Sequence, residues 1–521
     1  MLAAFLLLLA CGEAPVAPVA EVAEVDTGDA PAGLEASLLL ARRSLDLRGR
    51  RPTLDELDAV EADPAALDAL TAAYLDDPAL PQQMAWLWND SLHTAIWPST
   101  YTRFGAWTPE QWSAVGQEPL QIIAAVIAED RPFTEVVTEG RTQSNAALRA
   151  LYGLSGEGEG WTWTDYPDGR PMAGLLSTNA MWLRVTADAV NYNRARANAL
   201  ARTLLCADFL DRPGSFSFDI DPSSLSRVER AVALEPVCLS CHAALDPLAS
   251  LFGGFAERSD SQPLPGYLRY SALSADWFAA RQPPAYFGVP VADLHEASVL
   301  IAADPRFARC AARRFAEGLL GEPLDDLYLL DGFTEAFLAA DLVVRPYLAA
   351  LVEHPAYTTP EPRLLRSEQV GSALSAFLGL EASLTEGLGP LTWSVDHRVL
   401  SGGTDDDTVT TRAPNLGLGP ALVMEWSARA AAGPALSADL ARAPVDRVLF
   451  TVEGADAESP AEATVRAQLS RWMRALTSQP VDAEGDSIDG LYALYLRGAT
   501  PLSGYTLALQ AMLRHPAVMV Y

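Results

Sequence analysis

The spacing of apolar residues most constrains the fold of this chain, because it repeats at helical rather than at strand intervals. Segments rich in Ala, Leu, Arg and Glu carry apolar residues at positions i, i+3 and i+4, and alternating apolar and polar runs are few. With 521 residues, 50% of them hydrophobic, the chain is long enough for several domains with separate cores. We therefore expect a mainly α, multi-domain helical protein.

Local signals predict where individual helices begin. Thr53 is expected to cap a helix in which Glu56 completes a capping box. Residues 227–234 also read as a helix. Pro119 stands directly before the apolar run 120–127, and because Pro suits the first turn of a helix, we expect a new helix to begin there.

The organisation of the chain follows from composition shifts and one weak repeat. Residues 345–357 and 503–517 both read as a closing helix that ends at His-Pro-Ala, because Pro cannot continue a helix. Glycines and aromatic residues from 153 to 174 mark an earlier boundary. The predicted parts are a lipoprotein signal with an acidic disordered tether (1–33), an N-terminal helical domain (34–160), a second helical domain (161–357) and a C-terminal helical domain (363–521).

One pentapeptide, Cys238-Leu239-Ser240-Cys241-His242, carries a specific chemical signal. The spacing Cys-x-x-Cys-His is the one that covalent haem attachment requires. Two thiols one helical turn apart would add to the two vinyl groups of one porphyrin, and the adjacent imidazole would bind the iron as the proximal ligand. The motif therefore predicts a cytochrome c-like haem-binding segment in the second domain, with haem c held by Cys238, Cys241 and His242.

Other interpretations of the pentapeptide fit the sequence less well. A thioredoxin-like dithiol would lie at a strand-to-helix turn, whereas residues 227–234 read as a helix. A structural zinc site would need a second Cys/His pair at close spacing, and none follows. An incidental or disulfide-forming pair is the remaining alternative.

The sixth iron position decides what a haem can do, since a second strong ligand favours electron transfer and an open position permits peroxide chemistry. No Met occurs between Met181 and Met424. The candidate distal ligands are therefore His295, which lies downstream of the motif, and Met172 and Met181, which lie upstream. Each also has an ordinary interpretation, because Met residues beside apolar helices usually pack in the core and a lone His is usually at the surface.

Three further groups have a functional and a structural interpretation, and the structural one is favoured for each. Asp246 can hydrogen-bond the ring of His242, but Asp-Pro more often caps or ends a helix. The acidic run 405–407 has calcium-binding oxygens without the alternation of true calcium loops. Four tryptophans can line a carbohydrate or peptide surface, but their irregular spacing favours core packing: Trp86, Trp88, Trp97 and Trp107.

The start of the sequence predicts export. Residues 2–10 form an apolar run that is too short to span a bilayer, and the run ends in Leu8-Leu9-Ala10-Cys11, which resembles the lipobox of bacterial lipoproteins. That resemblance implies lipid attachment to Cys11, although no basic residue precedes it. Export permits disulfides, and the two remaining cysteines, Cys206 and Cys310, are expected either to form a bridge around the haem segment or to be isolated and buried.

Charge excludes some partners. The net charge of −30 opposes binding to nucleic acid or to bare anionic lipid. The sequence contains no lysine, so every cation is an arginine, and lysine-based chemistry is excluded. No phosphate-binding glycine loop, Ser-His-Asp elbow or paired-carboxylate motif stands out.

Several short segments together carry a family resemblance. They are the arginine-rich stretch 41–53 with its Leu-x-Gly-x-x-Pro-Thr turn, Glu118-Pro119 with residues 130–138, the haem motif with Asp246-Pro247, residues 304–314, and the Gly-Gly turn in residues 397–405. These segments resemble the planctomycete-type cytochrome c family, which comprises large exported bacterial chains with flanking domains of unknown function. The resemblance implies a haem-bearing surface protein and brings no established substrate. Relatives continue after Asp246-Pro247 with Gly and a Glu-x-Phe-Asp element, which residues 249–255 lack, so an altered haem pocket is implied.

These observations predict a bacterial envelope lipoprotein, anchored by its lipid at the outer membrane or cell surface, with a covalently bound c-type haem that transfers electrons to an unknown redox partner protein. One alternative is a haem-free surface scaffold or interaction lipoprotein, in which the helical domains carry the function. A further alternative is a haem enzyme of the peroxidase type, so electron transfer is favoured over catalysis without excluding it.

Overall fold

The computed structural model describes residues 35–95, 107–183, 185, 192–211, 224–255, 269–382, 390–406, 408–413 and 416–521. The predicted signal and tether, including Cys11, and also Trp97 lie outside the described residues. Helices account for 61% of the residues and strands for 3%, so the protein is mainly α, as predicted.

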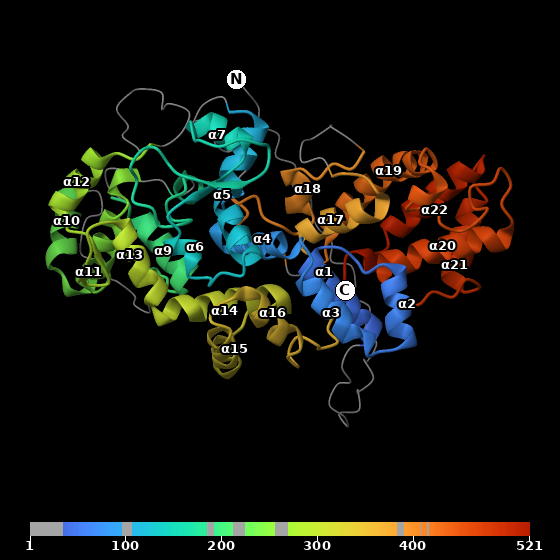
Figure 1. The fold of residues 1–521 in the computed structure, drawn as a ribbon, viewed down its shortest axis with the longest axis horizontal. Helices are drawn as coiled ribbons and strands as arrows, with labels where there is room; N and C mark the ends of the chain where they lie inside the picture. Colours follow the sequence, from blue (N-terminus) through green and yellow to red (C-terminus); the bar gives the residue numbers. More distant parts are fainter. Residues whose placement is uncertain are drawn as a thin grey trace, which may run out of the picture.

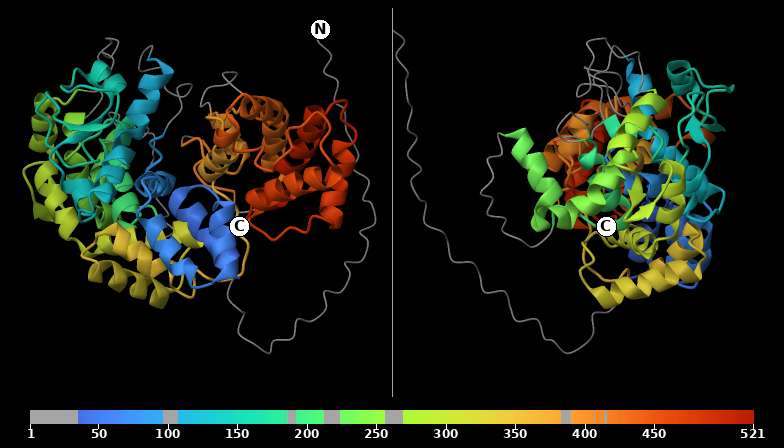
Figure 2. Two further views of the ribbon diagram at one scale, coloured as in Figure 1. Left: turned by 45° about the vertical axis from the view of Figure 1, so that its right-hand side comes forward. Right: turned by 90° about the vertical axis from the view of Figure 1, so that its left-hand side faces the viewer.

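The chain folds into two helical lobes, and the first helix of the first lobe lies at the junction between them (Figures 1 and 2). The helices of the first lobe are α1 (Ala36–Arg48), α2 (Leu54–Ala62), α3 (Ala66–Leu75), α4 (Leu80–Leu92), α5 (Pro109–Ala128), α6 (Glu135–Thr138), α7 (Ala146–Tyr152), α8 (Ala180–Leu183), α9 (Arg194–Leu205), α10 (Leu225–Leu234), α11 (Pro236–Ser250), α12 (Ala272–Arg281), α13 (Leu294–Ala303), α14 (Pro305–Leu320), α15 (Leu327–Ala339) and α16 (Val344–Val352). Those of the second lobe are α17 (Ser367–Leu378), α18 (Val395–Leu400), α19 (Leu418–Leu440), α20 (Glu462–Thr477), α21 (Asp486–Tyr495) and α22 (Pro501–Leu513).

Strands are short and form two antiparallel pairs among the described residues. Strand β1 (Thr142–Ser144) pairs with β2 (Thr162–Thr164), and β3 (Ala285–Tyr286) pairs with β4 (Val289–Pro290). Neither pair can hold a core by itself, so packing between helices determines the architecture.

Two hydrophobic cores correspond to the two lobes. The first core runs from Leu39 to Tyr357, and the predicted boundary at residues 160–161 lies inside it, since residues on both sides pack together. The second core contains residues 365–519 together with Leu45 of α1. Helix α1 therefore supplies side chains to both cores.

Helix α14 illustrates why these sequences form packed helices. Its apolar side chains repeat every four residues and are buried, as at Phe307, Ala311 and Phe315. Phe315 contacts several other aromatic rings in the centre of the first core, including those of Trp88 and Phe133. The arginines of α14 lie away from this core, where they form ion pairs with nearby carboxylates.

Two of the local helix predictions have different outcomes. Thr53 and Glu56 form the predicted capping box at the start of α2. The predicted helix start at Pro119 is wrong, because α5 begins at Pro109 and continues through Pro119 to Ala128. Burial explains the continuity, since α5 packs closely along α4 and this packing offsets one missing backbone hydrogen bond.

Helix α1 is buried between the lobes although it is rich in arginine. Figure 1 shows it beside the C-terminus, between the two lobes. Asp46, which is fully buried, accepts hydrogen bonds from the hydroxyl groups of Tyr357 (2.9 Å) and Tyr521 (2.6 Å), and from the Gln369 side chain (3.3 Å). Residues that end the first lobe, begin the second and end the chain thus converge on one carboxylate.

Arginines of the same segment satisfy buried backbone carbonyls. The Arg42 guanidinium donates to the carbonyls of Tyr357, Thr359 and Glu361 at 2.6–2.9 Å. Arg51 donates to carbonyls of the C-terminal residues 517–520 at 3.0–3.2 Å. Burial lowers the pKa of Arg51 to about 10, which still leaves it charged at neutral pH. These donors occupy carbonyls that have no helix or sheet partner, and such groups are costly to bury unpaired.

The predicted repeat has a structural counterpart. Helices α16 and α22 both end one residue before a His-Pro pair. The ring nitrogen Nδ1 of His354 accepts a hydrogen bond from the backbone N–H of Ala356 (3.1 Å), and His515 does the same for Ala517 (3.2 Å). Each turn is followed by one of the two tyrosines that bind Asp46.

A second polar junction joins α4 to the second lobe. The Arg412 guanidinium bridges Asp90 (2.6 Å) in the first lobe and Glu368 (2.9 Å) in the second. Although burial alone raises the pKa of Glu368, Arg412 and Arg398 outweigh burial and lower it to about 2. The junction therefore holds a carboxylate that stays charged in the folded protein under acidic conditions.

We predict that Asp46→Ala lowers the free energy of unfolding by about 3 kcal/mol, because two tyrosine hydroxyls and a glutamine amide lose a buried charged acceptor. Urea denaturation followed by circular dichroism measures the change. Glu335 is an exposed residue on α15, and Glu335→Ala is a control that should stay within about 0.5 kcal/mol of the wild type. An Asp46→Ala protein as stable as this control would contradict a central role for Asp46.

We also predict a pH dependence for the Glu368 junction. Because its folded pKa lies below the ordinary 4.5, its stabilising contribution is complete above pH 4.5 and is lost as the pH falls toward about 2. Between about pH 5 and pH 2 the wild type should lose about 2 kcal/mol more stability than Glu368→Gln. A Glu335→Gln control should follow the wild type, and parallel profiles for the wild type and Glu368→Gln would contradict the assignment.

Candidate functional site

The pentapeptide of the haem motif lies in the first two turns of α11. Pro236 is the first residue of this helix, so Cys238 and Cys241 stand one turn apart near its N-terminus. Both thiols are half-buried, and neither is bonded to another sulfur. The two sulfurs are thus available for a reaction at the surface of the first lobe.

The His242 imidazole is held by a carboxylate of the same helix. Its Nδ1 lies 2.9 Å from Oδ1 of Asp246, one turn further along α11. Asp246 in turn accepts two hydrogen bonds from the Arg194 guanidinium, at 2.6 and 2.9 Å. With Nδ1–H donating to Asp246, the lone pair of the second ring nitrogen, Nε2, is left for another partner.

The favoured interpretation of Asp246-Pro247 as a helix end is wrong. Helix α11 continues through Pro247 to Ser250, where Leu248 and Ala249 are buried in the first core. Asp246 therefore lies inside the helix, where positions i and i+4 share a face, and this places its carboxylate beside His242.

The charge state of Asp246 follows from these contacts. Burial alone raises its pKa, but the hydrogen bonds from His242 and Arg194 outweigh burial and hold the pKa below its ordinary value. Asp246 is consequently a carboxylate at neutral pH, and this charge favours an imidazole that donates its Nδ1 proton.

Helix α9 carries the outer member of this arrangement and is fixed at both ends. Arg194 is the first residue of α9, and Cys206 follows its last residue in a left-handed backbone conformation. The structure joins Cys206 to Cys310 of α14 by a disulfide. Because α9 packs against both α11 and α14, this bridge fixes the helix that supplies Arg194.

The candidate distal ligands make their contacts elsewhere. The His295 ring nitrogen Nδ1 lies 2.7 Å from the Met172 carbonyl, so these two candidates are neighbours on the first lobe. The Met172 side chain packs against a small cluster around Trp112, and Met181 is buried in the first core. None of these contacts involves His242, and the distal ligand remains a prediction.

The surface beside the motif is apolar. Leu234, Val237 and Leu239 are exposed large hydrophobic residues next to the two thiols. An exposed apolar patch of this kind is typical of a site that another group covers. Further along the helix, Asp246 and Ser250 border a cavity of about 260 Å³.

The donor residues of the motif, Cys238, Cys241 and His242, have the properties that a covalently attached haem requires. Unbonded thiols at i and i+3, an imidazole fixed through Nδ1 and an adjacent exposed apolar surface all fit such a group. The cavity beside Asp246 is lined by residues such as Tyr192 and Phe278 and by none of the three donor residues of the motif, so it is separate from the donor residues.

The contact of Arg194 with Asp246 could not be predicted from the sequence. Arg194 lies more than forty residues before the motif in the sequence, in a segment that reads as an ordinary polar helix. No local signal marks an arginine that reaches across to a second helix. Only the packing of α9 on α11 brings it to Asp246.

Of the acidic run 405–407, Asp407 lies outside the described residues and Asp406 is held by protein groups. Asp406 is fully buried and accepts hydrogen bonds from Asn89, Thr404 and Arg398 at 2.7–3.0 Å. Its oxygens therefore link α18 to α4 rather than face an ion. Across the described ranges, no group of three or more His, Cys, Asp or Glu side chains is placed to hold a metal ion.

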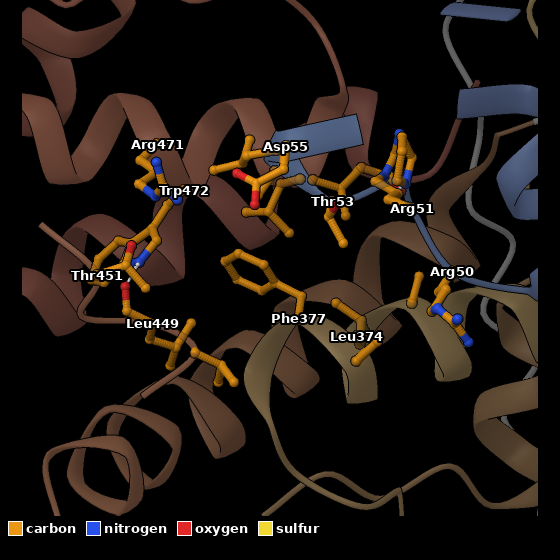
Figure 3. Close-up of a pocket in the computed structure, with 18 of the residues that line it drawn as sticks. Arg50, Arg51, Thr53, Asp55, Leu374, Phe377, Leu449, Thr451, Arg471 and Trp472 are labelled. Atoms are coloured by element: carbon orange, nitrogen blue, oxygen red, sulfur yellow. Dashed lines mark hydrogen bonds between the residues drawn. The ribbon is translucent and has the colours of Figure 1, made fainter. Parts of the chain in front are cut away.

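A pocket of about 360 Å³ between the start of α2 and the second lobe lacks comparable chemistry (Figure 3). Leu374 and Phe377 of α17 form an apolar wall, and Asp55 and Arg471 lie at its edge in the view. The indole N–H of Trp472 donates to the Leu449 carbonyl at 2.8 Å, so this buried donor is already satisfied. We assign the pocket to packing between α2 and the second lobe.

Within the part of the chain that the structure describes, no single helix combines the length and apolar composition needed to cross a membrane. One bent pair, Ser226–Val232 with Pro236–Ser250, meets those criteria only when both helices are counted together.

No family model, curated protein or solved structure matches this chain.

We predict that Cys238 and Cys241 react with an alkylating reagent and that Cys206 and Cys310 do not. In a Cys11→Ser background produced without haem, denaturation without reductant should give two labelled thiols, and reduction should give four. Intact mass spectrometry counts the adducts.

The matched control for this labelling is Cys206→Ser, which removes one half of the bridge and should raise the count without reductant to three. Four labels on unreduced protein would exclude the bridge. No labels would mean that Cys238 and Cys241 are themselves oxidised to a disulfide.

Proposed function

We propose that this protein is an electron-transfer lipoprotein of the bacterial cell envelope that carries one covalently bound c-type haem. The observation that carries the proposal is the arrangement on α11, where two unbonded thiols lie one turn apart and precede an imidazole held by Asp246. Cys238 and Cys241 hold the haem by thioethers, and His242 binds its iron through Nε2. The bound haem supplies one-electron redox chemistry.

The protein contributes orientation and charge to this site. Asp246 holds the His242 ring in one orientation and one tautomer, and Arg194 holds Asp246 from a second helix. A carboxylate bonded to the imidazole makes it a stronger donor, which favours the oxidised state of the metal. Arg194 weakens this effect of the carboxylate on the imidazole, because its positive charge offsets part of the negative charge of Asp246.

The position of the motif suits transfer to a partner protein. The two thiols are half-buried, and the neighbouring Leu234, Val237 and Leu239 are exposed, so a haem attached here lies near the surface. A redox partner can then approach its edge closely. Attachment to the membrane is proposed through a lipid on Cys11, which tethers the protein on the outer membrane or cell surface.

The proposal predicts that the protein, produced in a host that loads a known c-type cytochrome, retains haem through denaturing electrophoresis. Changing both Cys238 and Cys241 to Ala should abolish this haem. Changing both Cys206 and Cys310 to Ser is the matched control, because it also removes two cysteines and should leave the attachment intact. His242→Ala should alter the spin state seen in the absorption spectrum, since it removes an axial ligand.

Asp246→Asn separates the role of the carboxylate from attachment, because it keeps the shape of the side chain and removes the charge. We expect retained haem and a higher reduction potential.

A low-spin wild-type spectrum supports electron transfer, whereas a high-spin spectrum would favour a peroxidase-type enzyme. Folded wild-type protein without haem would contradict the proposal and favour the surface scaffold.

A further inference from the structure

A cavity between the lobes has a volume of about 760 Å³. Its walls come from α4 and α5 of the first lobe and from α17 and α18 of the second. This volume is typical of small-molecule binding sites, which often lie between domains. The cavity is separate from the motif on α11, which does not contribute to its lining.

Two tryptophans and several small polar groups line the cavity. Trp86 of α4 is half-buried and reaches it from the first lobe, and Trp393 reaches it from the second. The hydroxyl and amide groups of Ser113, Gln117, Ser372 and Ser375 add hydrogen-bonding partners. Of the tryptophans expected to pack in the core, Trp88 is buried in the first core, and Trp107 packs against the small cluster around Trp112. Trp86 packs against the first core and also borders this cavity.

Gly371 of α17 lets the Trp393 ring pack directly against the helix. A side chain at Gly371 would bring its Cβ within 3.1 Å of the Trp393 ring, so the absent side chain lets the indole lie against the helix. The indole Nε1 of Trp393 is buried and has no hydrogen-bond partner among the described residues. This donor is buried against α17, so it is not among the groups that the cavity offers to a ligand.

Charged groups in the wall are largely neutralised by one another or by their neighbours. Arg48 pairs with Glu56 (2.9 Å) and Arg50 pairs with Asp77 (2.6 Å). On the opposite wall Glu368 pairs with Arg412, and Arg398 pairs with Asp406. Glu381 also lines the cavity, is exposed and pairs with no cation among the described residues, so the uncompensated charge of the wall is negative. A negative wall disfavours nucleotides, phosphates and other strongly anionic ligands.

We propose that this cavity, the interlobe site, binds a neutral saccharide of one or two sugar rings. Aromatic faces pack against the apolar faces of sugar rings, and the serine and glutamine groups match the ring hydroxyls. The proposal does not rest on haem attachment, because no residue of α11 lines the site.

Isothermal titration of the full chain tests the proposal with a panel of glucose, galactose, mannose, N-acetylglucosamine and their β-1,4-linked disaccharides, each at up to about 10 mM. Glucuronate and glucose 6-phosphate are the charged comparisons. At least one neutral sugar should bind, and the charged sugars should bind more weakly. Absence of binding by every neutral sugar, or a preference for the charged ones, would overturn the proposal.

Variants locate the binding. Trp86→Ala removes an aromatic face, and Ser375→Trp fills the cavity, so each should weaken sugar binding about tenfold or more. Trp277→Ala is the matched control, because Trp277 is a partly exposed tryptophan on α12 that does not line the site. Circular dichroism checks that each variant is folded. Sugar binding that persists unchanged in folded Ser375→Trp would place the ligand elsewhere and overturn the assignment.

Discussion

The buried carboxylate of Asp46 and the arginines around it are the interaction on which the two-lobed structure depends. The end of the first lobe, the start of the second and the C-terminal residues all meet α1, and the last two also pair with each other through an antiparallel bridge between Leu364 and Val520. Tyr357 and Tyr521 bind one carboxylate, while Arg42 and Arg51 take up the carbonyls that follow α16 and α22. Burying such charged groups is costly unless each one has its hydrogen-bond partners. The group of Asp46 and its neighbouring arginines therefore stabilises only the folded arrangement in which all of these partners are in place.

The proposed haem segment is connected to this centre through a series of packed helices. Helix α1 packs on α4, α4 on α14, α14 on α9, and α9 on α11. Hydrophobic contacts hold α1, α4 and α14 together, and the disulfide between Cys206 and Cys310 reinforces the contact of α9 with α14. The Arg194–Asp246 ion pair links α9 to α11. The orientation of His242 is therefore determined by a rigid scaffold and not by the motif alone.

Periodicity predicted the helical class and the capping box at Thr53, because both depend on residues close in sequence. It placed a helix start at Pro119 and favoured a helix end at Asp246-Pro247, since a proline normally disrupts a helix. In both helices burial of the flanking apolar residues outweighs the lost hydrogen bond. The roles of Asp46 and Arg194 depend on partners that are distant in sequence, and no local pattern separates a buried arginine from a solvated one.

Peptide mass spectrometry tests haem attachment most directly. Trypsin cleaves after arginine, and the peptide from Ala231 to Arg258 contains both cysteines of the motif. In protein matured in a competent host, this peptide should carry the mass of one haem, with fragment ions that place it on Cys238 and Cys241. An unmodified peptide, recovered under conditions that load a known c-type cytochrome, would contradict the assignment of α11 as a haem-binding helix.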